Sequence, residues 1–427
     1  MMTLALSVLC AAVMMGPGDA GAVPGERPSI ADGVWRAWLD LESSPDGELP
    51  FQIRIRHPLT DDRPAGIAAW LVNGTEEIEI PVVRWEGDEL LLSMDYYDAH
   101  LRARVRADGR RMDGVYTKQR SAGPVSMGFH AEAGEGGTEG ARFRSNRERV
   151  LQSTQALRGK WRVTFEGGEE GVLVLDGTAE RTTGTILTTT GDYRYFAGDF
   201  PGEGLRLSAF DGAHAFLVHA RLLEDGGIRG EFWSGDWHHE TFEGKRDDDA
   251  ELRDGFSFTK SIGTGNVNEL KYVDMQGNER SLSEEALGGN SKARIVYVFG
   301  TWCPNCKDAT AFLNELRATH KDRDFEVVGL AFEVTGDKER DLKQVRTYVE
   351  RAGVEFPVLL AGVAEKKKAA EALPVIDAVK AYPTLLFVDG KGRIRAAYAG
   401  FSGPATGEEH EKLKRRMTGM VERLLGE

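Results

Sequence analysis

Two cysteines separated by two residues are the strongest chemical signal in this sequence. The motif WCPNC (residues 302–306) follows a continuous apolar run at 295–299 and precedes apolar residues at helical spacing. A buried strand that leads into a helix places both thiols at the helix N-terminus, where free N–H groups and the helix dipole stabilise an anion. We therefore predict that Cys303 is the attacking thiolate and that Cys306, one turn into the helix, resolves the mixed disulfide.

Other uses of a CxxC pair fit the sequence less well. The chain has three cysteines, so no second pair completes the four ligands of a structural zinc site. Lys307 stands where covalent haem attachment needs a histidine. Val296 and Gly300 occupy the positions where a peroxiredoxin carries Pro and Thr before its peroxidatic cysteine. The prediction is a redox-active disulfide between Cys303 and Cys306, with no metal and no cofactor.

A second motif, AYPT (residues 381–384), directly precedes an apolar strand. It resembles the cis-proline segment of the thioredoxin superfamily. That resemblance implies a cis bond before Pro383 and a substrate-binding role for Trp302, Tyr382 and Thr384. A cis bond would place the backbone of Tyr382 beside the cysteines, where it could pair with an extended substrate. The alternative is an ordinary trans proline that begins an edge strand.

The residues around these two motifs alternate between strand and helix patterns. Buried strands are predicted at 295–299 and 325–332, helices at 338–352 and 408–425, and hairpins at 271–278 and 385–398. This order is typical of an α/β domain with helices on both faces of its sheet. We predict a thioredoxin-like domain over residues 254–427.

The preceding residues show a different periodicity. Apolar and polar residues alternate in short runs, with turn signals about every ten residues, which predicts an all-β half made of antiparallel strands. Four short motifs occur in the same order twice, at 33–36 and 159–162, 87–93 and 202–208, 97–101 and 210–216, and 112–116 and 228–232. We predict β-rich repeats at 32–131 and 156–246, joined by a connector at 131–155. Each repeat has room for about eight strands, which suits a meander closed into a small barrel; one merged sandwich is the alternative.

Histidines in the all-β half could suggest a ligand site. His238 and His239 are adjacent on a predicted strand, so their side chains point to opposite faces and a shared metal is not expected. His100 and His214 occupy equivalent places in the two repeats and are expected to hold the same turn in each. Whether the predicted barrels are packed or hollow stays open.

The net charge of the chain and its N-terminal residues indicate which partners to expect and where the protein is located. The chain carries 68 acidic and 54 basic residues, a net charge of -14, so nucleic acid is not an expected partner. The apolar run at 4–13 is too short to span a bilayer, and Ala20 and Ala22 have the spacing of a signal-peptidase site. We predict a signal peptide at 1–22 and a periplasmic or otherwise extracytoplasmic protein. A lipoprotein anchor at Cys10 fits less well, because bulky Leu9 precedes it.

From about residue 256 onward the chain resembles the TlpA-like extracytoplasmic thiol–disulfide reductases, a family of thioredoxin fold. The matching segments are VDMQG (273–277), FGTWCPNC (299–306), YPT (382–384) and VDGKG (388–392). The segment GFSGPATG (400–407) is similar to a branch that carries paired β-rich repeats before the redox domain. The resemblance implies an exported protein with protein disulfides as substrates. It also implies a membrane electron donor that re-reduces the cysteines and provides the only membrane contact.

The sequence departs from this family at the proton acceptor. Many relatives carry Glu three residues after the second cysteine, where this chain has Ala309. Thioredoxin's buried acid, six residues before the first cysteine, is replaced by Tyr297. Glu333, at the end of a predicted strand, is the candidate substitute; the alternative is a solvated loop acid. Asn305 is neutral and adds no positive charge near the thiolate, which favours a reductant over a strong oxidant.

The sequence is compatible with two functions of different classes. The first is an exported thiol–disulfide oxidoreductase that mainly reduces protein disulfides. The second is a binding or scaffold protein whose β repeats hold a partner while the redox domain is weakly active. The intact cysteine and proline motifs favour the enzyme, and the missing acid at Ala309 keeps the scaffold open.

Overall fold

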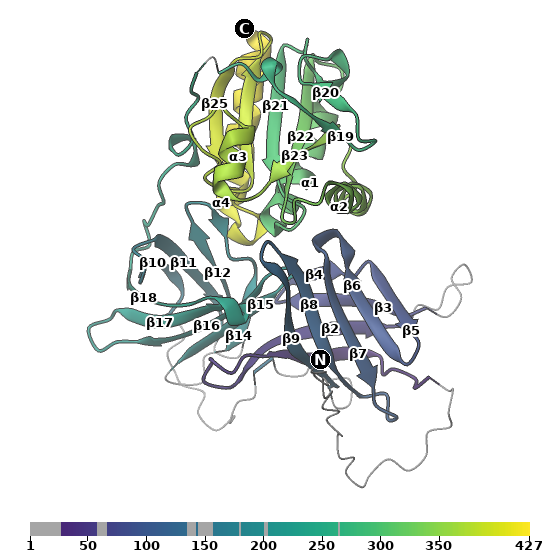
Figure 1. The fold of residues 1–427 in the computed structure, drawn as a ribbon. Coiled ribbons are helices and arrows are strands. Elements are labelled where there is room, and N and C mark those ends of the chain that lie inside the picture. Colours follow the sequence, from purple (N-terminus) through teal and green to yellow (C-terminus); the bar gives the residue numbers. More distant parts are fainter. Residues whose placement is uncertain are drawn as a thin grey trace, which may run out of the picture.

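A computed structural model describes residues 27–57, 66–134, 142–143, 157–178, 181–199, 204–263 and 265–427. The predicted signal peptide, with Cys10, and most of the predicted connector lie outside the described residues. The described chain forms an all-β N-terminal half and a C-terminal α/β domain, as the sequence predicts (Figure 1). Within these ranges, none of the helices combines the length and the apolarity needed to cross a membrane.

The first repeat is a nine-stranded antiparallel sheet in the order β4-β3-β2-β1-β9-β8-β7-β6-β5. Its strands are β1 (Gly33–Asp40), β2 (Glu48–Arg56), β3 (Ala68–Asn73), β4 (Glu76–Glu79), β5 (Val82–Glu86), β6 (Glu89–Met94), β7 (Ala99–Val105), β8 (Arg111–Arg120) and β9 (Gly123–Ala133). In the described residues β4 and β5 are the two ends of the sheet and do not pair. This repeat is therefore a barrel-like meander whose sheet stays open between β4 and β5.

The second repeat also has nine strands, and eight of them close into a ring. The strands are β10 (Gly159–Phe165), β11 (Glu170–Gly177), β12 (Thr182–Thr188), β13 (Gly191–Asp192), β14 (Phe196–Asp199), β15 (Leu205–Phe210), β16 (Ala215–Leu222), β17 (Ile228–Ser234) and β18 (His239–Arg246). Pairing of β11 with β12 completes the ring, and the short β13 extends β12 as a hairpin. The predicted barrel of about eight strands is confirmed here.

The second repeat fills the opening of the first. The ring of Phe210 packs 4.3 Å from that of Phe51 and 5.3 Å from that of Tyr116, centroid to centroid. Asn73, at the end of β3, exchanges two hydrogen bonds with the backbone of Phe210 at 3.0 and 3.2 Å. Burying an aromatic ring is strongly favourable, so the first repeat completes its core with a neighbour rather than by closing on itself. The two repeats keep separate sheets, but they share a hydrophobic core.

The C-terminal domain is a seven-stranded sheet in the order β20-β19-β23-β22-β21-β24-β25. Its strands are β19 (Lys271–Asp274), β20 (Glu279–Ser281), β21 (Ala293–Phe299), β22 (Phe325–Glu333), β23 (Val358–Val363), β24 (Thr384–Asp389) and β25 (Ile394–Ala399), and its helices are α1 (Pro304–Thr319), α2 (Lys338–Arg351), α3 (Lys366–Ala372) and α4 (Glu408–Gly426). Every residue of the central strand β21 is buried, as its continuous apolar sequence predicts. Strand β23 and helix α3 were not predicted from the sequence.

The α/β domain rests on both repeats (Figure 1). Arg340 of α2 forms an ion pair with Asp98, and the Gln344 amide donates to the carbonyl oxygens of Asp95 and Tyr96, each at 3.0 Å. These acceptors belong to the turn between β6 and β7 of the first repeat. The second repeat touches the same domain through the β12–β13 hairpin, whose contacts are part of the site described next.

Candidate active site

Helix α1 presents both cysteines at its first turn. Pro304 occupies the first helical position, where its missing N–H removes no hydrogen bond. Cys303 is the N-cap residue, and its Sγ accepts a hydrogen bond from the backbone N–H of Cys306 at 3.2 Å. On its other side the same thiol donates to the carbonyl oxygen of Tyr382 at 3.4 Å. Both cysteines are free thiols; Cys303 is 6% exposed and Cys306 is fully buried.

The proline segment lies directly beside this pair. The Tyr382–Pro383 bond is cis, which confirms the predicted conformation. The rings of Trp302 and Tyr382 pack edge to face with centroids 5.2 Å apart, and the Trp302 Nε1–H donates to the Phe332 carbonyl at 3.0 Å. Thr384 is fully buried and donates to the Ala381 carbonyl at 2.8 Å, so its side chain holds the turn. Trp302 and Tyr382 are half-buried and border the sulfur atoms.

A chain of hydroxyl groups lies beneath Cys306. The Tyr297 hydroxyl donates to the Cys306 carbonyl at 2.6 Å and lies 3.2 Å from the Thr310 hydroxyl, which lies 2.9 Å from that of Tyr348. Burial raises the pKa of the Cys306 thiol well above its usual value, and neighbouring Cys303 raises it further. The Tyr297 hydroxyl acts in the opposite direction and lowers the Cys306 pKa. A phenol therefore stands where thioredoxin has a carboxylate.

Glu333 is a buried acid rather than a solvated loop acid. Its side chain is 2% exposed, and its two oxygens accept hydrogen bonds from the Thr301 N–H at 3.0 Å and the Thr301 hydroxyl at 2.8 Å. Burial raises the pKa of Glu333 to about 8, although the two Thr301 hydrogen bonds oppose the shift. These contacts join Glu333 to the residue two before Cys303, and not to either sulfur atom.

The hairpin between β12 and β13 of the second repeat holds the residue between the cysteines. The Asn305 amide donates to the Asp192 carbonyl at 3.3 Å and to the Phe401 carbonyl at 3.4 Å. The Asp192 carboxylate accepts from the Gly403 N–H at 2.6 Å. Gly191 makes this approach possible, because a Cβ there would lie 2.2 Å from the Asn305 nitrogen and its φ is +152°. The segment GFSGPATG (400–407), which resembles a family branch with paired β-rich repeats, is thus a docking loop for the second repeat.

One buried cation joins all three parts of the chain. Arg194 of the second repeat forms ion pairs with Asp308 of α1, with Asp211 at 3.3 Å and with Glu76 of the first repeat at 3.4 Å. Its side chain is 5% exposed. Burial raises the pKa of Glu76 to about 7 even though Arg194 lowers it. Charges held this deep are stable only while they remain paired, so Arg194 fixes the repeats against α1.

The first repeat contributes a second buried cation. Lys118 of β8 is 9% exposed, and its ammonium donates to the Ala213 carbonyl at 2.8 Å. Burial lowers the pKa of Lys118 to about 8, while negative charge on Asp211 and on Cys303 acts to raise it. No local pattern indicates Lys118 as a site residue, because its partner Ala213 lies in the other repeat.

Comparison with known proteins agrees with this geometry. Residues 265–397 match the AhpC/TSA family. The match covers most of the C-terminal α/β domain, which has a thioredoxin-like fold. This domain keeps Val296 and Gly300 at the two positions where a peroxidatic motif would need Pro and Thr. No metal-binding cluster of three or more His, Cys, Asp or Glu side chains occurs in the described parts of the chain.

Curated relatives are thiol–disulfide oxidoreductases named ResA. That of Geobacillus kaustophilus is 26% identical over 132 residues, which cover 31% of this chain and 66%, just under two thirds, of that protein. That of Bacillus thuringiensis subsp. konkukian is 23% identical over 146 residues, 34% of this chain and 73% of that protein. A crystal structure of a thiol:disulfide interchange protein of the thioredoxin family from Chlorobium tepidum TLS is 23% identical and covers 39% of this chain and 99% of its own, with a TM-score of 0.29.

The structure brings together most of the residues singled out in the sequence. Cys303, Cys306, Trp302, Tyr382 and cis-Pro383 form one cluster. Outside the site, His100 and His214 each lie within 3.7 Å of an aspartate of the preceding turn, Asp98 and Asp211, which confirms their matching roles. His238 and His239 each contact a different glutamate, Glu240 and Glu231.

Several residues at the site were missed. Thr310 and Tyr348 complete the hydroxyl chain, Asp192 and Arg194 come from the second repeat, and Lys118 comes from the first. Thr310 could have been found, since it lies four residues after Cys306 and therefore on the same face of the helix. The contacts from the repeats carry no local sequence signal, because they depend on how the domains pack.

Proposed function

We propose that this chain is an exported thiol–disulfide oxidoreductase that mainly reduces protein disulfides through the CPNC pair. The observation that carries the proposal is the position of the Cys303 sulfur. It caps helix α1, accepts from the Cys306 N–H and lies 3.4 Å from the carbonyl of Tyr382 beside cis-Pro383. A sulfur in this position has the Cys306 N–H to stabilise its anion and an adjacent backbone edge for a substrate.

The proposed reaction transfers two electrons from the pair to the substrate. The Cys303 thiolate attacks one sulfur of a substrate disulfide, so that a mixed disulfide forms and the other substrate sulfur leaves as a thiolate that takes a proton. Cys306 then loses its proton and attacks the Cys303 sulfur. The mixed disulfide breaks, the Cys303–Cys306 disulfide forms, and the substrate leaves as a dithiol.

Proton transfer at Cys306 is the demanding step, because burial holds its pKa high. We assign Glu333 as the proton acceptor on the strength of its burial beside the cysteine loop and its pKa of about 8, which allows it to exchange protons near neutral pH. The Tyr297 hydroxyl assists by stabilising the Cys306 anion. The positive charge of the Lys118 ammonium favours the Cys303 thiolate, a role that neutral Asn305 cannot take.

The substrate is expected to lie across the proline segment. The backbone of Tyr382 would pair with an extended stretch of the substrate, and the half-buried Trp302 and Tyr382 rings would border the disulfide. Pro383 keeps a backbone N–H away from the sulfur atoms, since proline has none. Thr384 contributes by fixing the turn through its bond to Ala381.

The proposal also includes export of the protein and re-reduction of the Cys303–Cys306 disulfide. The apolar run at 4–13 with Ala20 and Ala22 supports a leader that carries the protein to the periplasm or another extracytoplasmic space. Each turnover leaves the pair oxidised, so a donor must return two electrons. We propose a membrane-bound thiol reductant for this role, and no cofactor on this chain.

The second candidate, a binding protein with a weakly active redox domain, is favoured by one observation. Cys303 is 6% exposed, and the β12–β13 hairpin holds Asn305 beside it. A folded partner could not reach the sulfur unless the hairpin moved. In this alternative the repeats hold the partner and the cysteines turn over slowly.

Substrate trapping tests the proposal. Cys306→Ser leaves the attacking thiol but removes the resolving one, so mixed disulfides should accumulate on Cys303 in the native compartment and disappear on treatment with a reductant. Cys303→Ser in the same vector is the control and should trap nothing. A Cys306→Ser protein that carries no more covalent partners than the control would contradict the reductase and leave the binding protein.

A further inference from the structure

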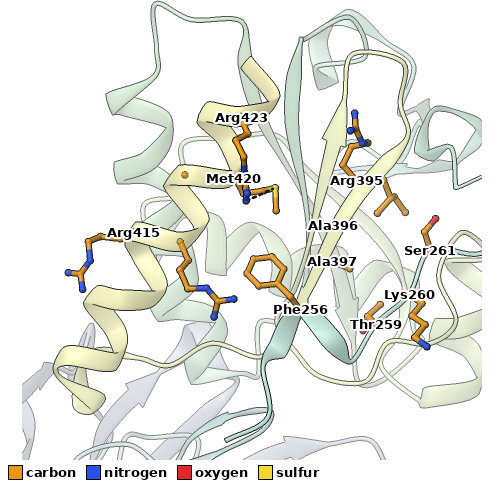
Figure 2. A pocket seen from close by; sticks show the side chains of 13 residues that line it. Phe256, Thr259, Lys260, Ser261, Arg395, Ala396, Ala397, Arg415, Met420 and Arg423 are labelled. Atoms are coloured by element: carbon orange, nitrogen blue, oxygen red, sulfur yellow. Dashed lines mark hydrogen bonds between the residues drawn. The ribbon is translucent and has the colours of Figure 1, made fainter. Parts of the chain in front are cut away.

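A groove lies on the α/β domain outside the cysteine site. It has a volume of about 870 Å³ and runs between α4 and the edge strand β25. Figure 2 shows α4 on one side, the strand that carries Ala396 and Ala397 on the other, and the ring of Phe256 between them. All of its lining residues belong to the C-terminal domain. Space of this size holds a ligand or a short stretch of peptide.

Every charged residue that lines the groove is a cation. They are Lys260, Arg395, Arg415, Arg416 and Arg423. Two have carboxylate partners: Arg416 binds Asp254 at 2.7 Å, and Arg395 binds Glu427. In the described part of the chain, no carboxylate lies within ion-pair distance of the side-chain nitrogens of Lys260, Arg415 or Arg423. The Asp377 carboxylate accepts from the backbone N–H of Lys260 at 2.9 Å. In a protein whose net charge is -14, five cations around one groove indicate an anionic occupant.

Two small residues keep the groove open. Gly419 lies in the middle of α4, where glycine costs a helix about 1 kcal/mol relative to alanine. A Cβ at this position would meet no atom within 4 Å, so no neighbour requires the glycine. Ala396 lines the facing strand. Larger apolar side chains at these positions would close the gap between helix and strand, as side chains do elsewhere in the core.

One buried polar group at the groove lacks a hydrogen-bond partner in the described structure. Thr259 lines it and is 4% exposed, and its hydroxyl has no hydrogen-bond partner in the described structure. The chain around Thr259 contacts β25 at two places: the ring of Phe256 packs on that of Tyr398, and the Ile394 N–H donates to the Gly265 carbonyl at 2.9 Å. Between these points no backbone hydrogen bond reaches 395–397 from outside the sheet in the described residues. An edge strand of this kind can pair with an added extended chain.

We infer that this groove binds an extended, acidic segment of a partner protein. The cations would pair with its carboxylates, the ring of Phe256 and the side chain of Met420 would take its apolar side chains, and the open edge of β25 would bind its backbone. Phe256 is half-buried beneath the Arg416 guanidinium, 5.0 Å from its ring centre, so the apolar surface is recessed rather than protruding. A recessed floor suits a peptide better than a membrane surface.

The inference is tested by fluorescence anisotropy with the full chain and a labelled peptide of alternating Glu and Leu. The peptide should bind, lose affinity as salt is raised, and bind at least about tenfold more weakly, a change of 1.4 kcal/mol, to Gly419→Leu and to Arg423→Glu. Gly419→Ala, which adds one methyl to open space, and Lys321→Glu, an exposed charge outside the groove, should bind like the unmodified protein.

Three results would overturn the inference: no binding, equal binding by all variants, or groove-dependent binding to anionic phospholipid vesicles without binding to the peptide. Binding to vesicles alone would show that the cations of the groove bind a membrane surface and not a peptide. Exchange activity separates this inference from the proposed function, because Gly419→Leu should reduce insulin at the same rate as the unmodified chain. Peptide binding in a chain that lacks exchange activity would support the groove and contradict only the reductase.

Discussion

The Asn305 side chain donates a hydrogen bond to the backbone carbonyl of Asp192 at 3.3 Å. Asn305 lies between the two cysteines of the redox pair, and Asp192 lies in the β12–β13 hairpin of the second repeat. Through this contact a β-rich domain more than a hundred positions earlier in the sequence bears directly on the cysteine loop. We therefore expect access to Cys303 to depend on how the repeats sit against α1.

Disturbing this contact should expose the attacking thiol. In Gly191→Ala the added Cβ would lie 2.2 Å from the Asn305 nitrogen, an overlap that costs about 1–3 kcal/mol. The hairpin should move away, and alkylation of Cys303 by iodoacetamide should become several-fold faster. Gly168→Ala, also at positive φ but with open space around its Cβ, is the control. Equal alkylation rates in the two variants would show that the hairpin does not limit access.

Removing the buried cation should destabilise the assembly of the three parts. In Arg194→Met the carboxylates of Asp308, Asp211 and Glu76 lose their shared partner, and breaking a buried ion pair from one side costs about 3–5 kcal/mol. Urea unfolding at neutral pH measures the loss. Arg229→Met removes a half-exposed partner of Glu243 in the same repeat and should cost about 1 kcal/mol or less. A loss in Arg194→Met no larger than in this control would contradict the role of Arg194.

The Tyr297 hydroxyl should assist the resolving thiol. Tyr297→Phe removes a hydrogen bond worth about 1 kcal/mol, or roughly fivefold in rate. The pKa of Cys306 should rise further, so the rate of mixed-disulfide resolution should fall and its pH profile should move to higher pH. Tyr272→Phe is the matched control, because that hydroxyl donates to the Ala372 carbonyl and not to the cysteine loop. If both variants keep the pH profile of the unmodified protein, Tyr297 is structural only.

Glu333 should make stability depend on pH. Its pKa is about 8 in the folded protein against an ordinary value of 4.5, so between these values the folded state keeps a proton that the unfolded chain has lost. The stabilisation is therefore full below pH 4.5 and is lost as the pH rises through 8, by at most about 5 kcal/mol. Glu333→Gln should flatten this part of the profile in urea unfolding, and exposed Glu371→Gln should not.

The same variant tests the catalytic assignment of Glu333. A glutamine keeps the shape of the side chain and can still bond to Thr301, but it cannot take a proton. If Glu333 accepts the proton of Cys306, Glu333→Gln should slow resolution of the mixed disulfide at neutral pH without slowing the first attack by Cys303. An unchanged resolution rate together with a flattened stability profile would make Glu333 a structural acid.

The sequence predicted the elements that carry strong local patterns. The apolar run at 295–299 gave a fully buried strand, and CPNC with the proline segment gave the correct neighbours for Cys303. The strand β23 was missed, because its Val358–Val363 run is short and only partly buried, which periodicity does not separate from a loop. The open form of the first repeat depends on Phe210 of the other repeat, and such packing leaves no pattern within either repeat.

Insulin reduction by dithiothreitol tests the central claim most directly. The unmodified chain should accelerate the reduction, because Cys303 attacks the insulin disulfides and dithiothreitol returns the pair to its dithiol form. Cys303→Ser should reduce insulin no faster than dithiothreitol alone. An unmodified chain that does not exceed Cys303→Ser would contradict exchange chemistry at the CPNC pair and leave a protein whose repeats bind a partner.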